Sequence, residues 1–208
     1  MLTMRIDPSA LRSRYLRVHT FLQDVPLQDV WVIQLRGGGT GRTIHDLRPL
    51  FTYAGLQAVH PVVKGLFRLR ERLGTLLGWD QQRPTWRTES YVHRLTPTDR
   101  AQSVVSPGTL EGPFSVLYVF EHEQLHELRN ATVHAFSSLS MGPAQDGYLA
   151  YWAIYVKPVS RWTALYMTAI APFRRLLVYP AIIRQVQRAW AARYGGEDTV
   201  QERTTRVG

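Results

Sequence analysis

The sequence predicts an α+β fold in which a curved antiparallel β-sheet wraps around a long C-terminal helix. Three observations predict it. One β-patterned segment stands early in the chain, three more follow one another between residues 113 and 156, and an apolar helical stripe runs from residue 162 to residue 190. Consecutive strand-like segments with short connections favour antiparallel pairing, and the final helix can cover the apolar face of such a sheet.

The first strand is predicted at residues 29–35, which are rich in β-branched and aromatic side chains and end at three consecutive glycines. Two helices are expected after it. Thr43 or Asp46 can cap the first, with Pro49 favouring the later start, and the second has apolar residues at three- and four-residue intervals over 61–77. The glycine-rich turn lacks the spacing of a phosphate-binding loop, so it is interpreted as a connection.

The next segments change to a two-residue period. Residues 113–121, 131–141 and 147–156 predict strands, separated by HEQLHELRN and GPAQDG, and residues 91–95 are a shorter strand candidate. Residues 162–190 then predict the C-terminal helix, which Pro172 and Pro180 must each kink or restart. This order is that of the helix-grip fold, which leaves a cavity between sheet and helix. The expected organisation is an N-terminal extension at 1–27, one domain at 28–193 and a flexible tail at 194–208.

Composition narrows the possible functions. The chain carries 25 Lys and Arg against 16 Asp and Glu, a net charge of +9, but the arginines are scattered and no nucleic-acid-binding motif accompanies them. The chain has no cysteine, which excludes disulfides and thiolate metal sites. No apolar run is long enough to span a membrane. We therefore expect a cytoplasmic protein with no nucleic-acid partner, no stable membrane insertion and no cofactor, and the oligomeric state stays undetermined.

The pentapeptide His122–His126, HEQLH, matches the H-E-x-x-H signature of zinc hydrolases. That signature works on a long helix, where both histidines and the glutamate project to one side. Here β-patterned residues flank it on both sides. We therefore keep zinc hydrolysis through His122 and His126 only as a remote alternative, and we expect a strand edge or a connection between strands.

Three stretches together resemble one known family. They are GPFSVLYVFEHEQLHELRNATVHAFSSLSM, GYLAYWAIYVKPVSRWTALYMTAIAPFRRLLVYPAII and LFRLRERLGTLLGWD. This pattern, over about residues 29–190, resembles the DUF2867 family, which we associate with the Bet v 1-like (START/SRPBCC) superfamily. The resemblance implies a helix-grip fold with an internal pocket. It does not imply a reaction.

Two functions remain open. The first is binding of a hydrophobic or aromatic small molecule, lipid-like or polyketide-like, in the inferred cavity, and we choose it because aromatic residues concentrate on the predicted sheet and terminal helix. The second is an enzyme that uses the same pocket for cyclase, dehydratase or hydrolase chemistry, with Glu127, His134 or His93 as acid or base. The expected ligand-binding residues are Tyr118, Phe120, Arg129, Asn130, Phe136, Trp152, Tyr155, Tyr166, Phe173 and Arg174.

Overall fold

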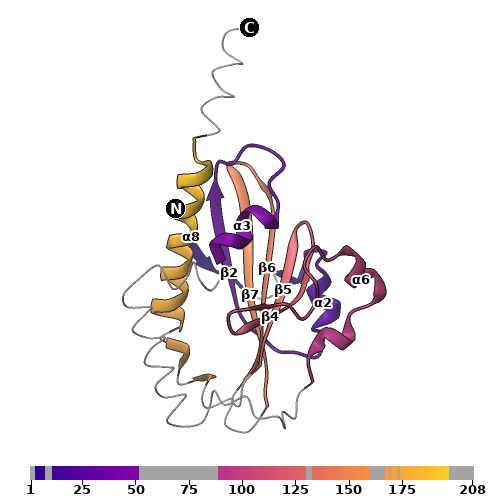
Figure 1. The fold of residues 1–208 in the computed structure, drawn as a ribbon. Helices are drawn as coiled ribbons and strands as arrows, with labels where there is room; N and C mark the ends of the chain where they lie inside the picture. The colour runs from indigo at the N-terminus through magenta and orange to yellow at the C-terminus, as the bar shows by residue number, and fades with distance from the viewer. Residues whose placement is uncertain are drawn as a thin grey trace, which may run out of the picture.

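The structure is a computed structural model, and it describes residues 3–7, 11–51, 89–129, 133–159, 167–168, 170–172 and 174–196. These residues form a twisted sheet with helices on both faces (Figure 1). The strands are β1 (Thr3–Arg5), β2 (Leu27–Arg36), β3 (Leu110–Glu111), β4 (Phe114–Val119), β5 (Glu123–Arg129), β6 (His134–Ala144) and β7 (Gly147–Lys157). The helices are α2 (Arg17–Phe21), α3 (Ile44–Phe51), the 3-10 helix η1 (Tyr91–Arg94), α6 (Pro97–Gln102), the π-helix η2 (Arg174–Val178) and α8 (Tyr179–Tyr194).

Within the described residues the seven strands make one sheet, in the order β1-β2-β7-β6-β5-β4-β3. Every neighbouring pair is antiparallel. The early strand β2 lies beside the last strand β7, and α8 follows at the C-terminal end (Figure 1). The predicted α+β class, with an antiparallel sheet and a C-terminal helix, is confirmed, as are the strands expected at 29–35, 113–121, 131–141 and 147–156.

Two local predictions need correction. The HEQLHELRN segment was expected as a connection or strand edge, but its residues 123–129 form β5, which pairs with strands on both sides. Residues 91–95 were expected as a strand, but 91–94 form η1 because the Ser90 hydroxyl accepts the Val92 amide and the Glu127 carboxylate accepts the Tyr91 amide. The chain before residue 28, expected as an N-terminal extension, also contributes β1 and α2.

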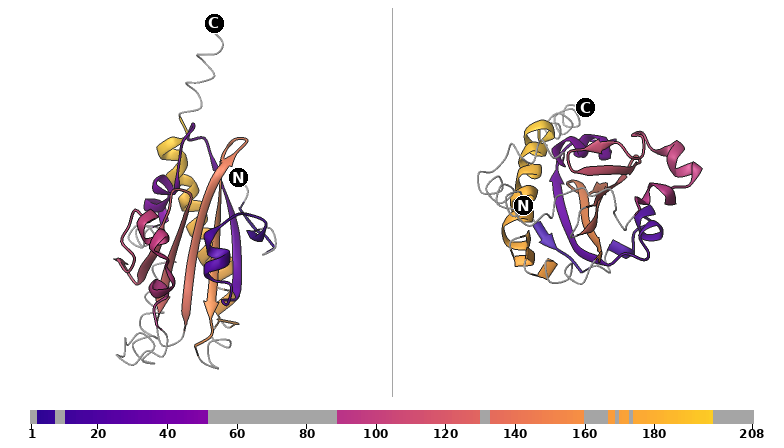
Figure 2. Two further views of the ribbon diagram at one scale, coloured as in Figure 1. Left: turned by 90° about the vertical axis from the view of Figure 1, so that its right-hand side faces the viewer. Right: turned by 60° about the horizontal axis from the view of Figure 1, so that its bottom comes forward.

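Helices lie on both faces of the sheet (Figure 2), and apolar side chains are buried on both. We call the face that packs against α3 and α8 the inner face; its cluster includes Trp31, Leu139 and Trp152. The opposite outer face packs against α2 and η1, and its cluster includes Tyr118 and Phe136. Alternation of side chains along each strand assigns neighbouring residues to opposite faces.

The start of the C-terminal helix α8 coincides with a proline. Pro180, which has no N–H to donate, occupies the first turn of α8, directly after the π-helix η2. In α3 the start is earlier than Pro49 suggested: the helix begins at Ile44, and the Asp46 carboxylate accepts the Thr43 amide at 3.0 Å. In the described part of the chain, no helix combines the length and the apolar character needed to cross a membrane.

The hairpin between β6 and β7 depends on a glycine. Gly147 has a φ of +127°, and a Cβ there would lie 2.3 Å from the Leu35 carbonyl oxygen. We expect Gly147→Ala to lower the free energy of unfolding by about 2 kcal/mol or more, because backbone strain and a backbone clash add. Gly196→Ala, where a Cβ meets nothing within 4 Å, should change it by less than about 0.5 kcal/mol. Urea unfolding followed by circular dichroism measures both, and equal stability of the two variants would contradict the assignment.

Candidate functional site

Strand β5 divides its charged residues between the two faces of the sheet. Glu123 lies on the outer face, almost fully buried, and both of its carboxylate oxygens accept backbone amides from the first turn of α2, Arg17 N and Val18 N, each at 2.8 Å. The Tyr118 hydroxyl donates a third hydrogen bond at 2.5 Å. Burial raises the pKa of Glu123 above its ordinary value despite these bonds. Glu123 therefore attaches α2 to the sheet.

Glu127, four residues further along β5, attaches η1 to the sheet. It accepts hydrogen bonds from the Tyr91 amide at 2.9 Å, the Ser90 hydroxyl at 2.6 Å and His134 Nε2 at 2.7 Å. Burial alone would raise the pKa of Glu127, but these hydrogen bonds outweigh it and hold the pKa below its ordinary value. Glu127 and His134, two of the acid or base candidates, thus lie together in the outer core and hold η1.

Other predicted site residues also belong to the outer face. Arg129 Nε lies 3.5 Å from Glu127 Oε2, so the two share a face as expected for a strand. His93 is exposed, and its Nδ1 lies 2.6 Å from the Ser90 carbonyl oxygen. Four aromatic residues expected to line a cavity under the C-terminal helix pack instead with α2 and η1, because the strand alternation turns them away from α8: Tyr118, Phe120, Phe136 and Tyr155.

Residues 123–126 of the HEQLH segment lie in strand β5, whereas the zinc-hydrolase signature requires a helix. In β5 the side chains of Glu123 and His126 point to opposite faces, so the glutamate cannot lie beside a water held by the histidine. His122 is exposed and lies 3.8 Å from Glu121. In the described ranges no three His, Asp or Glu side chains gather in a geometry that could hold a metal ion.

The inner face is unevenly covered. Toward the β6–β7 hairpin, Leu139, Met141 and Ala150 are buried beneath α3 and α8. Further from the hairpin the central strands carry a half-buried stretch, which we call the floor: Leu128, Ala135, Ser137 and Ile154. Their outer-face neighbours Phe136 and Ala153 are each only 1% exposed. Solvent therefore reaches the inner face at these positions, although Val156, which pairs with Ala135 on the same face, is buried.

One polar group borders the floor on the β5 side. His126 pairs across the sheet with Ser137, and its Nε2 donates to Glu111 Oε2 at 3.2 Å. Glu111 also pairs with Arg48 of α3. Burial and the positive charge of Arg48 lower the pKa of His126 to about 4, so the imidazole is neutral at physiological pH. A neutral ring, whose one N–H is donated to Glu111, thus borders the floor.

Aromatic rings border the floor toward the hairpin. Trp31 and Trp152 pair across β2 and β7, and both rings contact Tyr179 edge to face, at centroid distances of 5.6 and 5.1 Å. Phe51 of α3 packs on Trp152 at 5.5 Å, and Trp152 Nε1 donates to the Ser137 hydroxyl at 2.9 Å. We call Trp31, Phe51, Trp152 and Tyr179 the aromatic group.

Two polar atoms near the aromatic group are buried without a hydrogen-bond partner. They are Trp31 Nε1 and Gln124 Oε1, and Gln124 lies in the same cross-strand row as Trp31, Trp152 and Leu139. Each such atom costs about 1–3 kcal/mol when it stays unpaired. An unpaired donor and an unpaired acceptor, both buried, thus lie in this part of the inner face.

Three arginines border the floor on the β2 side. Asp29 pairs with Ile154 across the sheet, and its side chain is fully buried. Arg175 Nε donates to Asp29 Oδ1 at 2.8 Å, Arg5 Nε lies 3.3 Å from the same oxygen, and Arg174 Nη1 lies 3.6 Å from Oδ2. We call Arg5, Arg174 and Arg175 the arginine cluster.

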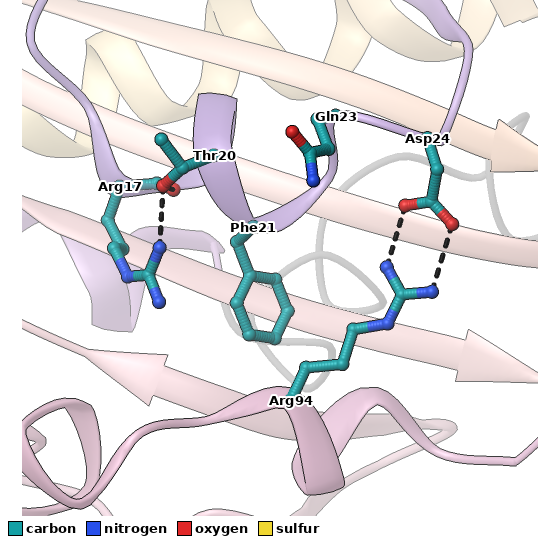
Figure 3. Close-up of a pocket in the computed structure, with 6 residues that line it drawn as sticks. All are labelled: Arg17, Thr20, Phe21, Gln23, Asp24 and Arg94. Atoms are coloured by element: carbon teal, nitrogen blue, oxygen red, sulfur yellow. Dashed lines mark hydrogen bonds and ion pairs between the residues drawn. The ribbon is translucent and has the colours of Figure 1, made fainter.

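The outer face carries a surface groove of about 390 Å³ between α2 and η1 (Figure 3). Both of its arginines are committed to carboxylates. Arg94 forms a double contact with Asp24 at 2.6 and 2.9 Å, and Arg17 forms one with Asp99 at 2.9 and 2.8 Å. The groove therefore has no unbalanced charge of its own.

Part of the inner site was predictable from the sequence. Of the residues predicted from the sequence, Trp152 and Arg174 lie there. Four other predictions lie outside the described residues: Asn130, Tyr166, Phe173 and the helix expected at 61–77. Asp29 was not predicted as a site residue. Two signals pointed to it: an acid at the start of an apolar strand is unusual, and the stretch 147–196 contains no acid to pair with Arg174 and Arg175. The residues around His126, namely Arg48, Glu111 and Ser137, were not predicted either.

The fold and the site define an α+β protein whose antiparallel sheet carries a partly half-buried, aromatic and polar inner face next to its C-terminal helix. The chain belongs to the family described as protein of unknown function (DUF2867), whose model matches residues 21–181. Comparison with curated proteins gives no match, and comparison with solved structures gives none either. The function must therefore be argued from the site itself.

The structural role of the HEQLH glutamate can be tested by truncation. We expect Glu123→Ala to lower the free energy of unfolding by about 2–4 kcal/mol, because two buried amides and a buried hydroxyl lose their acceptor. Glu121→Ala removes an exposed carboxylate and should change it by less than about 0.5 kcal/mol. Chemical denaturation measures both, and metal analysis accompanies it: zinc lost from a Glu123→Ala protein of unchanged stability would favour the metal site instead.

The environment of His126 predicts a pH dependence. Its pKa in the folded state is lowered from 6.5 to about 4, so the unfolded chain binds the proton more readily. The contribution of His126 to stability is fully present above pH 6.5 and is lost as the pH falls towards about 4. We expect its ring resonances to titrate near pH 4 in NMR spectra and at higher pH in Arg48→Gln, which lacks the repelling charge. A midpoint at or above 6.5 would show that the ring is not buried as described.

Proposed function

We propose that the protein binds an apolar or aromatic small molecule between the sheet and the C-terminal helix, as helix-grip (Bet v 1-like) proteins do. The strand order β2-β7-β6-β5-β4-β3 followed by α8 is compatible with that fold. A ligand in this position would lie on the floor, against the aromatic group.

One observation carries the proposal. Ala135, Ser137 and Ile154 stand in the two longest strands of the sheet, yet they are half-buried on the inner face, whereas the outer-face residues between them are sealed. Central strands normally bury both faces when helices cover both. The half-buried stretch leaves some apolar surface that a ligand of matching chemistry would bury.

The unpaired atoms support the same location. Trp31 Nε1 and Gln124 Oε1 would gain partners from a ligand that carries an acceptor and a donor, and few convergent polar groups in an apolar surface are typical of small-molecule sites. The acid or base candidates Glu127 and His134 lie on the other face, so they do not support the enzymatic alternative at this site.

A substitution that fills the space above the floor tests the proposal. We expect wild-type protein to bind N-phenyl-1-naphthylamine, an uncharged dye that fluoresces in apolar surroundings, with saturation at one equivalent. Ala135→Trp should weaken that binding about ten-fold or more, because the indole occupies the ligand's place and displacing it costs at least about 1.4 kcal/mol.

The matched control is Leu110→Trp, which adds an indole at an exposed position of β3. It should bind the dye like the wild type. Thermal unfolding of both variants shows whether each is folded. Absence of saturable dye binding to the wild type, or unchanged binding in a folded Ala135→Trp protein, would refute the proposed site.

A further inference from the structure

The arginine cluster carries more positive charge than the protein neutralises there. Asp29 is the one carboxylate that the described residues bring to Arg5, Arg174 and Arg175, so three guanidinium groups share a single negative charge. The surplus is two positive charges beside a fully buried carboxylate. Arg5 and Arg175 are partly exposed, whereas the Arg174 side chain is mostly buried, so part of this surplus is held away from solvent, where an unbalanced charge is costly.

The donors of the cluster are also incompletely used. Arg174 Nη1 donates to the Tyr179 hydroxyl at 2.9 Å, but Arg174 Nε is buried and has no hydrogen-bond partner. Asp29 Oδ2 likewise accepts no hydrogen bond. Each guanidinium presents five N–H donors in a fixed plane, which suits two oxygens of a carboxylate or phosphate group. The geometry thus leaves free donors on a positively charged site.

The cluster lies at one end of the proposed ligand site. Asp29, Ile154, Ser137 and His126 form one row across the inner face, so the cluster stands directly beside the floor. Arg174 and Arg175 come from the π-helix η2 immediately before α8, and π-helical turns occur frequently at functional sites. Tyr179 links the cluster to the aromatic group through its hydroxyl and its ring.

We propose that the arginine cluster binds the anionic oxygen group of an amphiphilic ligand, a carboxylate or a phosphate ester, whose apolar body lies on the floor. This assignment rests on the proposed function and adds the chemical class of the ligand. Arg174 and Arg175 hold the anionic group, Arg5 adds charge from the sheet edge, and Asp29 keeps the three guanidiniums together while no ligand is bound.

The test compares two ligands that share a ten-carbon chain and differ in the head group, which is an anionic carboxylate in one and an uncharged hydroxyl in the other. Decanoate and decanol are titrated at pH 7.5 against protein loaded with N-phenyl-1-naphthylamine, and displacement of the dye is measured. We expect decanoate to compete at least about ten-fold better than decanol, the size of effect that one charge-assisted contact produces. If decanoate displaces the dye no better than decanol, the inference is wrong while the proposed function stands. If the dye itself does not bind, the proposed function fails.

Three variant proteins complete the experiment: two with opposite expected effects on decanoate binding and one control. Replacing both Arg174 and Arg175 by Gln should weaken decanoate about ten-fold and leave decanol unchanged. Replacing Arg184 and Arg188, exposed on α8, by Gln removes the same charge elsewhere and should change neither ligand. Asp29→Asn releases the guanidiniums from their internal carboxylate and should strengthen decanoate several-fold. Weaker decanoate binding to a folded Asp29→Asn protein would mean that the cluster is only a structural ion network.

Discussion

The alternation of side chains along β5 is the constraint on which the rest of the structure depends. Its two glutamates face outward and accept the first amides of α2 and η1, while Gln124 and His126 face the C-terminal helix. A slip of one residue would bury both carboxylates against α8 and leave the two helices unattached. The register of one strand thereby decides which face of the sheet is sealed and which remains accessible.

The two faces of the sheet consequently differ in kind. On the outer face buried carboxylates are fully used by hydrogen bonds from helix amides and side chains, and the aromatic residues there are core. On the inner face α3 and α8 cover the half toward the β6–β7 hairpin, and the floor beyond it is bordered by a neutral histidine and by surplus arginine charge. We infer a ligand site from the second face because, among the described residues, unpaired polar atoms, half-buried apolar surface and surplus positive charge lie together there.

The H-E-x-x-H match shows how a motif depends on the period of its secondary structure. On a helix, residues i and i+4 share a side and the glutamate lies near them; on a strand, the same residues alternate. Composition alone suggested a connection, because Glu123, His126 and Glu127 are types that are mostly exposed. They are buried here because their partners come from far along the chain, as with the Val18 amide, 105 residues away from Glu123.

The sequence by itself determined the strands with β-branched and aromatic composition, the C-terminal helix restarted by Pro180, and the α+β class, because these follow from local propensity and periodicity. It also carried the family resemblance that the family model bears out. Only the tertiary structure decided which face each strand residue occupies, and that Arg5 and Arg175 meet at Asp29. Such contacts depend on strand register and on the packing of α8, and no local pattern encodes either.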